Sequence, residues 1–271
     1  MILYGCPIWM QGTVRQRQKL QQIQRVALLK ITKAFTTTST AALQILAGIL
    51  PLDLKAEEER LTYRLLHFKE SAIENGLTIL EESALEPHIR TTASHPASSV
   101  DIKWDKLPPL NADLEIFTDG SKTDSKVGAA FVVFHNAQEI HQEQYRLSDH
   151  ATVYQAESLA LKQAALWISS SDSISHSIYT DSLSILQGLN RIGSQPLHVS
   201  SLKEILSTLA YTKNISLHWV RGHHGTQGNE RADALAKAAT ELQQITKETP
   251  VSLITAKNRI HGHFMSIWHT R

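Results

Sequence analysis

The sequence predicts an α/β protein in which a mixed five-stranded sheet is flanked by helices and preceded by a helical segment. Two short apolar strands end on the same dipeptide, Thr118-Asp119 and Thr180-Asp181. Further strands and helices alternate around them, with apolar residues recurring at periods of two and of 3.6. Residues 1–88, in contrast, show helical patterns only. Because open α/β sheets keep their sites at the carboxyl ends of strands, the two aspartates are the first candidates for a functional site.

Composition divides the chain into four parts. Of its 271 residues 42% are hydrophobic, which is enough for a buried core. A net charge of +1 gives no argument by itself for a nucleic-acid partner. We expect a helical segment, a linker rich in Pro, Ser, Thr and His, an α/β domain and a C-terminal amphipathic helix, at residues 1–88, 89–112, 113–241 and 242–271.

The cysteine content and the apolar runs predict the compartment. Cys6 is the single cysteine, which excludes an intramolecular disulfide and suits a reducing environment. No apolar run reaches the length of a membrane span, and the N-terminus lacks the basic lead of a signal peptide. We therefore expect an intracellular protein with no membrane partner, and both cytoplasm and nucleus fit.

The helical segment begins with an uneven distribution of charge. Six Lys or Arg residues and no acidic residue precede Asp53. They fall on a predicted amphipathic helix whose apolar face is Leu20, Ile23, Ala27, Ile31 and Ala34. The basic face is either solvated or a contact for nucleic-acid phosphates.

Two more helices are predicted in this segment. Residues 40–46 form a short helix that Gly48 closes. Asp53 caps a longer helix that continues to Ala72 and that Gly76 ends.

The α/β domain begins with the strand that leads to Asp119, where Gly120-Ser121 predicts a turn. Strands over 127–134 and 139–147 follow as an antiparallel meander. Next comes a helix that begins near Thr152 and places Glu157 at the edge of its buried face. The remaining elements are the strand that leads to Asp181, helices over 183–189 and 200–211, a strand over 215–219 and a helix from Asn229.

Four acidic residues in this domain each have an ordinary structural explanation. Asp119 fits a plain Asp-Gly turn, and Glu157 fits a solvated residue beside Lys162. Asp181 fits a helix N-cap, which contributes about 1 kcal/mol. Asp233 fits an i,i+4 pair with Lys237, which contributes a few tenths of a kcal/mol. Their joint occurrence on successive elements nevertheless indicates a shared site, because clustered carboxylates repel one another unless divalent cations bind between them.

The order of these motifs resembles type 1 ribonuclease H. The residues that support the resemblance are Asp119-Gly120-Ser121, Glu157, Thr180-Asp181-Ser182, Trp219-Val220-Arg221-Gly222-His223 and Asn229-Glu230-Arg231-Ala232-Asp233. The resemblance covers about half of the chain and implies a ribonuclease H-like fold. It also implies hydrolysis of the RNA strand of RNA:DNA hybrids, with 5′-phosphate and 3′-hydroxyl ends.

The resemblance further implies the roles of individual residues. Asp119, Glu157, Asp181 and Asp233 would hold two Mg²⁺ ions roughly 4 Å apart, with Mn²⁺ as a substitute. His223 would assist proton transfer or product release from a glycine-flanked loop, and its neighbour His224 is an alternative. Contacts to the substrate would come from Gly120, Ser121 and Asn229. The chain lacks the basic, Trp-rich handle of bacterial members, so its grip on substrate must come from elsewhere.

A second resemblance covers the N-terminal segment, which is similar to the tail of non-LTR retrotransposon reverse transcriptases. The residues that support it lie at 3–9, 24–31 and 37–48, followed by Pro51-Leu52. No Tyr-x-Asp-Asp occurs, so the polymerase site is missing and the polymerase portion would be a partner. Two alternatives stay open at this point: a catalytically silent ribonuclease H-like module that supports a reverse transcriptase, and a protein that binds nucleic acid without cleaving it.

Overall fold

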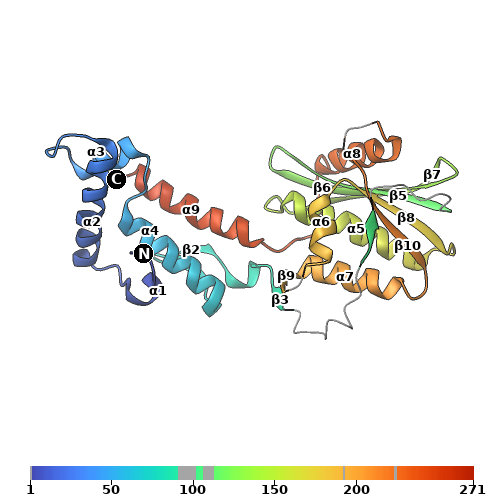
Figure 1. Ribbon diagram of the computed structural model, residues 1–271, viewed down its shortest axis with the longest axis horizontal. Coiled ribbons are helices and arrows are strands. Elements are labelled where there is room, and N and C mark those ends of the chain that lie inside the picture. The colour runs from blue at the N-terminus through green and yellow to red at the C-terminus, as the bar shows by residue number, and fades with distance from the viewer. Residues whose placement is uncertain (1, 91–101, 106–112, 192, 223–224) are drawn as a thin grey trace. The chain divides into compact units, whose positions relative to one another are not determined.

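The computed structural model describes residues 2–90, 102–105, 113–191, 193–222 and 225–271 (Figure 1). These residues form two compact units. One unit combines the chain up to Leu85 with Leu253–Arg271, and the other comprises Glu86–Ser252. Within the described ranges, no helix has both the length and the apolar character that a membrane crossing requires.

The Glu86–Ser252 unit is built on a mixed sheet with the strand order β4-β10-β8-β5-β6-β7. The strands are β4 (Trp104–Asp105), β5 (Leu114–Thr123), β6 (Lys126–His135), β7 (Gln138–Leu147), β8 (Ser175–Thr180) and β10 (Asn214–Trp219). The first three long strands, β5 to β7, form an antiparallel meander, whereas β8, β10 and β4 continue the sheet beyond β5 in parallel. The α/β class is confirmed.

The sheet has six strands where the sequence predicts five. The additional strand, β4, consists of two residues inside the predicted linker and pairs with Leu217 and His218 of β10. Two residues carry too little periodicity to be recognised as a strand, and only the exposed edge of β10 makes them one.

Helices cover both faces of this sheet, as Figure 1 shows. They are α5 (Val153–Ser170), α6 (Leu183–Leu189), α7 (Leu197–Leu209) and α8 (Gln227–Thr240). The larger core lies between one sheet face and α5, α6 and α7, and α8 packs on the other face through Ala232, Leu235 and Ala236. Because both faces are covered, β6 is buried continuously from Val127 to Phe134.

Two glycines let α8 approach the sheet closely. A Cβ on Gly128 of β6 would lie 2.3 Å from the carbonyl oxygen of Ala236, and one on Gly228 of α8 would lie 2.2 Å from the ring of Phe117. Either side chain would force the helix away from the sheet.

The turn predicted at Gly120-Ser121 is wrong. Both residues stay in β5 and pair with β6, and the chain turns only at Asp124 and Ser125, which have φ of 47° and 70°. A long antiparallel partner keeps β5 extended, and two left-handed residues supply a tight hairpin turn. The helix predicted over 200–211 also begins earlier, at Leu197.

Segments on either side of the α/β domain belong to the same unit. The short strands β3 (His88–Arg90) and β9 (Ser194–Pro196) pair antiparallel. The backbone N–H of Glu86 donates to the Val251 carbonyl at 2.8 Å. The Glu86 carboxylate accepts a hydrogen bond from Gln155 of α5 at 3.1 Å and another from His198 of α7.

The other unit is mainly helical. It contains α1 (Cys6–Trp9), α2 (Val14–Thr32), α3 (Thr40–Ala47), α4 (Leu52–Tyr63), a π-helical turn η1 (Arg64–Phe68), strands β1 (Ala72–Glu74) and β2 (Leu77–Leu80), a 3-10 turn η2 (Glu82–Ala84) and α9 (Leu253–His269). The short helix closed by Gly48 is confirmed as α3, and the amphipathic C-terminal pattern forms α9, with Ala256, Ile260 and Phe264 buried.

The predicted apolar face of α2 is mostly wrong. The buried residues are Leu20, Gln24 and Leu28, whereas Ile23 is 48% exposed and Ile31 is 61% exposed. The side chain of Gln24 bonds to the backbone at Leu50 and Leu52 and to the amide of Gln44, so its polar atoms are satisfied inside the unit.

The basic face of α2 is also smaller than the sequence suggests. Arg25 donates to the carbonyls of Thr36 and Thr38, which fixes the turn before α3. Arg17 lies 3.9 Å from Glu57 of α4. These two arginines therefore have structural roles.

The helix that begins near Asp53 is shorter than predicted and does not reach Ala72. Regular α4 stops at Tyr63, the π-helical turn follows, and Lys69 is left-handed with φ of 56°. A β-hairpin then turns at Asn75-Gly76, both at positive φ. Asn-Gly is a strong signal for a type I′ hairpin turn, and here it overrides the helical spacing of the residues before it.

Candidate metal centre

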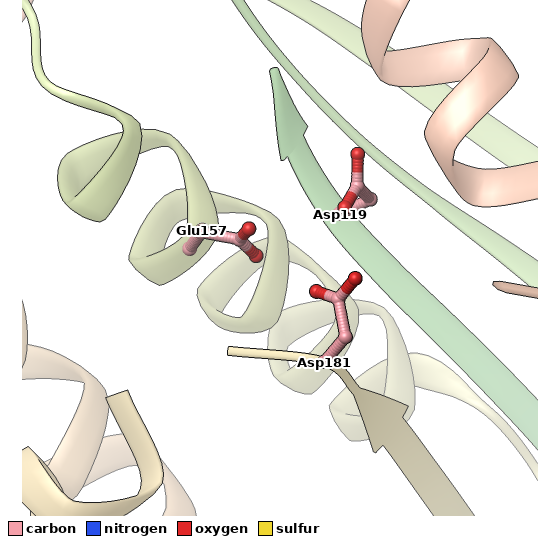
Figure 2. A group of neighbouring side chains, drawn as sticks. All are labelled: Asp119, Glu157 and Asp181. Carbon is pink, nitrogen blue, oxygen red and sulfur yellow. The ribbon is translucent and has the colours of Figure 1, made fainter. Parts of the chain in front are cut away.

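Three of the four predicted carboxylates meet at one end of the sheet. Oxygens of Asp119, Glu157 and Asp181 all lie within 4.8 Å of one another. Figure 2 shows the side chains converging from β5, from α5 and from the residue after β8. The structure thus brings together residues that are up to 62 positions apart in the chain.

Strand register explains why the two aspartates are neighbours. In the parallel pair β5 and β8, Thr118 lies opposite Thr180, which is the last pair between these strands. Asp119 and Asp181 follow directly, so both side chains reach the same edge. Asp119 itself is 6% exposed and remains paired with β6 through Ala130.

Glu157 reaches this edge because α5 lies very close to β5. A Cβ on Gly120 would be 2.5 Å from the backbone nitrogen of Glu157, so only glycine permits this approach. The helix starts with a capping box between Thr152 and Gln155, which confirms the predicted cap and fixes the phase of α5. Glu157 is 8% exposed, and its Oε2 has no hydrogen-bond partner among the described residues.

The cluster makes ionisation of its carboxyls unfavourable. The pKa of Asp119 rises from 3.8 to about 7. Burial contributes most to this rise, and the negative charges of Asp181 and Asp233 contribute the rest. Burial and the charges of Asp119 and Asp181 raise the pKa of Glu157 well above its usual range. The backbone N–H of Gly120 lowers both pKa values and offsets only part of this effect.

Asp181 is held through its backbone and its neighbours. Its carbonyl oxygen accepts a hydrogen bond from Trp219 Nε1 at 3.0 Å. Gly222 lies so close that an added Cβ would be 2.6 Å from Asp181 Oδ2. The end of β10 and Gly222 therefore both lie against Asp181, and Gly222 lies against its carboxylate.

Asp233, the fourth predicted ligand, is outside the group of three. Its Oδ2 lies 2.7 Å from Lys237 Nζ on α8, which is the i,i+4 pair that the spacing allows. Its charge still acts on Asp119, whose pKa it raises. Asp233 is thus near the cluster but bonded to a cation of its own helix.

The other predicted site residues are Ser121 on β5, Asn229 on α8, and two histidines. Ser121 is half-buried on β5, next to Gly120. Asn229 of α8 is 3% exposed, and its Oδ1 is buried without a partner in the described part of the chain. His223 and His224 lie outside the described residues.

The residues present fit a divalent metal ion. Three carboxylates supply the hard oxygen ligands that Mg²⁺ prefers. The buried, unpartnered Oε2 of Glu157 and the raised pKa values of Glu157 and Asp119 are the features that a cation would relieve. The fold and the cluster together define an α/β protein with an acidic centre at the sheet edge.

Comparison with known proteins identifies the family. The RNase H family model matches residues 111–241. The ribonuclease H of Bartonella bacilliformis is 34% identical over 146 residues, which cover 48% of this chain and 92% of that protein. The chain belongs to the ribonuclease H family.

Other matches are shorter. The ribonuclease H of Cupriavidus necator is 40% identical over 76 residues, covering 24% of this chain and 52% of that protein. The ribonuclease H of Ralstonia nicotianae is 35% identical over 77 residues, covering 24% and 51%. The chain thus spans about half the length of these curated relatives.

Two solved structures also match part of the chain. The crystal structure of RNase H1 from Halobacterium salinarum matches with a TM-score of 0.39 and 20% identity, over 46% of this chain and 96% of that chain. The N-terminal RNase H domain of a Mycobacterium tuberculosis protein matches with a TM-score of 0.39 and 19% identity, over 48% and 95%.

Sequence reasoning missed residues that support the centre from a distance. Glu86 and Pro250 both bond to Gln155, at the start of the helix that carries Glu157. These contacts join positions 69 and 95 residues apart, so no local pattern could reveal them. The close approach at Gly120 also left no signal beyond a glycine beside an aspartate.

Proposed function

We propose that this protein hydrolyses the RNA strand of RNA:DNA hybrids at the Asp119, Glu157 and Asp181 cluster, as a type 1 ribonuclease H. The convergence of these three carboxylates, of which Asp119 and Glu157 are buried, in a chain of the ribonuclease H family supports the proposal most directly. Asp233 completes the proposed ligand set once it exchanges Lys237 for a metal ion.

The chain's own residues would position the metal and the substrate. Asp119, Glu157 and Asp181 would hold the divalent cations, two Mg²⁺ ions or Mn²⁺ as their substitute. When bound, the metal would activate a water molecule and stabilise the leaving 3′-oxygen. Water adds to phosphorus, the P–O3′ bond breaks and the 3′-oxygen takes up a proton, which leaves a 5′-phosphate and a 3′-hydroxyl. His223 would assist the proton transfer.

Selection of RNA would depend on its 2′-hydroxyl. A buried acceptor that lacks a partner favours a substrate that donates a hydrogen bond, and Asn229 Oδ1 is such an acceptor. Gly120 and Ser121, which lie beside the cluster on β5, would contact the same strand. DNA, which lacks the 2′-hydroxyl, would leave this acceptor unsatisfied.

We further propose that the chain derives from a non-LTR retrotransposon protein, with residues 1–88 as a remnant of the reverse transcriptase. The N-terminal motifs support this proposal, and a polymerase portion would then be a partner of the chain. The exposed basic residues that remain on α2, such as Lys19 and Lys30, would contribute contacts to nucleic-acid phosphates.

The test is cleavage of an end-labelled RNA annealed to DNA by the purified full chain. We expect cleavage with Mg²⁺ or Mn²⁺, none with EDTA, and none of the same RNA alone or of duplex DNA. Product ends can be read by their response to phosphatase and polymerase. A folded chain that binds Mg²⁺ and the hybrid but leaves the RNA intact would identify the catalytically silent module instead.

A further inference from the structure

A second feature of the Glu86–Ser252 unit is a hollow of about 750 Å³ between α5, α6 and the start of α7. Its volume lies in the range of small-molecule pockets, roughly 300–1,000 Å³. Two aromatic rings, several amide side chains and one arginine line it. The lining residues include Trp104, Tyr154, Ser184, Arg191 and Gln195.

Gln195 offers a fixed hydrogen-bond acceptor to this hollow. The residue is 2% exposed, and its Nε2 donates to the carbonyls of Gly188, at 3.0 Å, and of Arg191. These two bonds orient the amide. Its Oε1 is buried and has no partner in the described part of the chain. An unsatisfied buried acceptor is unfavourable, so the site favours a ligand that donates a hydrogen bond.

The aromatic rings offer a surface for stacking. Trp104 and Tyr154 are half-buried at the margin of the main core. The ring of Tyr154 is held edge-on against His198, with centroids 5.4 Å apart. Burial raises the pKa of the Tyr154 hydroxyl, and the charge of the exposed Arg191 offsets part of this rise, so the guanidinium lies within electrostatic range of the hydroxyl.

The hollow borders the elements that form the acidic cluster. Tyr154 precedes Glu157 by about one turn of α5, and Ser184 of α6 follows Asp181 by three residues. A nucleic-acid strand with one phosphodiester at the cluster can therefore reach the hollow with a neighbouring nucleotide.

We propose that this hollow binds one unpaired nucleotide of the substrate, and the proposal rests on the hybrid-cleaving function above. A base stacks on aromatic side chains only when its faces are free, and every base offers an N–H donor when it is unpaired. Gln195 Oε1 accepts that donor, Trp104 and Tyr154 contact the ring, and Arg191 pairs with the phosphate. Fully paired bases satisfy none of these groups. The protein therefore prefers hybrids that end in, or contain, a single-stranded extension.

The test is the dissociation constant of the full chain for two fluorescent hybrids in EDTA, where no cleavage occurs. One hybrid is blunt, and the other carries an unpaired three-nucleotide extension, tried at either RNA end. We expect one of the extensions to tighten binding roughly tenfold, the scale of stacking one base on an aromatic side chain. Arg191→Ala and Trp104→Leu should remove this gain and leave the affinity for the blunt hybrid unchanged.

Arg259→Ala is the matched control, because it removes one exposed arginine from α9 in the other unit. It should keep the gain from the extension. Circular dichroism checks the fold of each variant, and the exposed Arg191 keeps the test decisive if Trp104→Leu fails to fold. No gain from either extension, or an equal loss of affinity for blunt and extended hybrids in Arg191→Ala, would overturn the proposal. The binding measurement needs no metal. If the protein proves unable to cleave the hybrid, the measured dissociation constants therefore still test the proposed nucleotide site.

Discussion

Two groups of carboxylates in the described residues differ in what surrounds their charges. One group lies on α4, in the unit that combines the N-terminal helices with α9. The other is the cluster at the sheet edge of the Glu86–Ser252 unit. The carboxylates of α4 are buried, as are Asp119 and Glu157, whereas Asp181 is half-buried. Burial alone therefore does not separate the two groups, and the difference comes from the charges around them.

On α4 each buried carboxylate has a cation beside it. Asp53 lies 2.9 Å from Arg271, and Glu57 lies 2.7 Å from Arg60. Glu58 has both Lys55, at 2.6 Å, and His261, at 3.1 Å. These pairs connect α4 to its own next turn and to α9.

At the sheet edge the described residues give Asp119 and Glu157 no ion-pair partner. Burial and mutual repulsion raise the pKa of both. A folded protein keeps such an arrangement only if something outside the chain neutralises it, and a hard divalent cation does so best. Paired carboxylates therefore indicate structure, and clustered carboxylates with raised pKa indicate a site.

The largest effect should come from a change inside the cluster. We expect Asp181→Asn to abolish hybrid cleavage, a loss of about 10³-fold or more, because it removes one charge from the metal site while keeping the size of the side chain. The fold should persist, and without metal the variant should be at least as stable as the parent because repulsion is relieved. Cleavage rates and thermal melting measure both. Retained cleavage would show that the cluster is not the reactive centre.

The histidine loop should give the next largest effect. The resemblance to type 1 ribonuclease H selects His223, which lies ten residues before Asp233. We expect His223→Ala to lower turnover by roughly 10²- to 10⁴-fold with little change in hybrid binding, the usual range for losing a proton-transfer group. His224→Ala is the matched control and should change little. A larger loss in His224→Ala would shift the register by one residue.

The pH dependence of stability should separate the two carboxylate groups. The folded protein binds a proton on Asp119 up to about pH 7, whereas the unfolded chain releases it near pH 4. The stability from this proton is fully present below about pH 4 and is lost as pH rises through 7. In EDTA, the free energy of unfolding of Asp119→Asn, relative to that of the parent, should therefore increase by about 1–3 kcal/mol from pH 5 to pH 8.

Urea unfolding at the two pH values measures this difference. Mg²⁺ should stabilise the parent more at pH 8 than at pH 5, because the cation competes with protons for the same oxygens. An equal difference between variant and parent at both pH values would mean that the carboxyl of Asp119 is not perturbed in the folded protein.

The smallest effect on catalysis should come from α4. Among the described residues, Arg271→Ala leaves the side chain of the buried Asp53 with Gln21, whose Nε2 is 3.5 Å away. We expect unfolding to become easier by about 1–3 kcal/mol, the scale of an unsatisfied buried polar group, with hybrid cleavage unchanged. Arg259→Ala, which removes an exposed arginine from α9, should affect neither. Lost cleavage in Arg271→Ala alone would mean that the two carboxylate groups are not independent.

The same contrast shows what the sequence could predict. Strands β6 and β7 and the helix of Glu157 follow local periodicity and a capping box, so their prediction succeeded. The prediction of the buried face of α2 failed because Gln24 is buried with its polar atoms satisfied, and no hydrophobic pattern reveals such a residue. The position of Asp119 next to Asp181 depends on strand register, and the Asp53 pair joins residues 218 apart. Local sequence thus predicts elements and candidate carboxylates, whereas only the fold decides which of them are paired.

The most direct test of the central claim is the anomalous scattering of a crystal of the full chain soaked in Mn²⁺. We expect an anomalous peak among the carboxylates of Asp119, Glu157 and Asp181, and none beside Asp53, Glu57 or Glu58. A sheet edge without Mn²⁺ at a concentration that supports cleavage, or a peak on α4 instead, would contradict it.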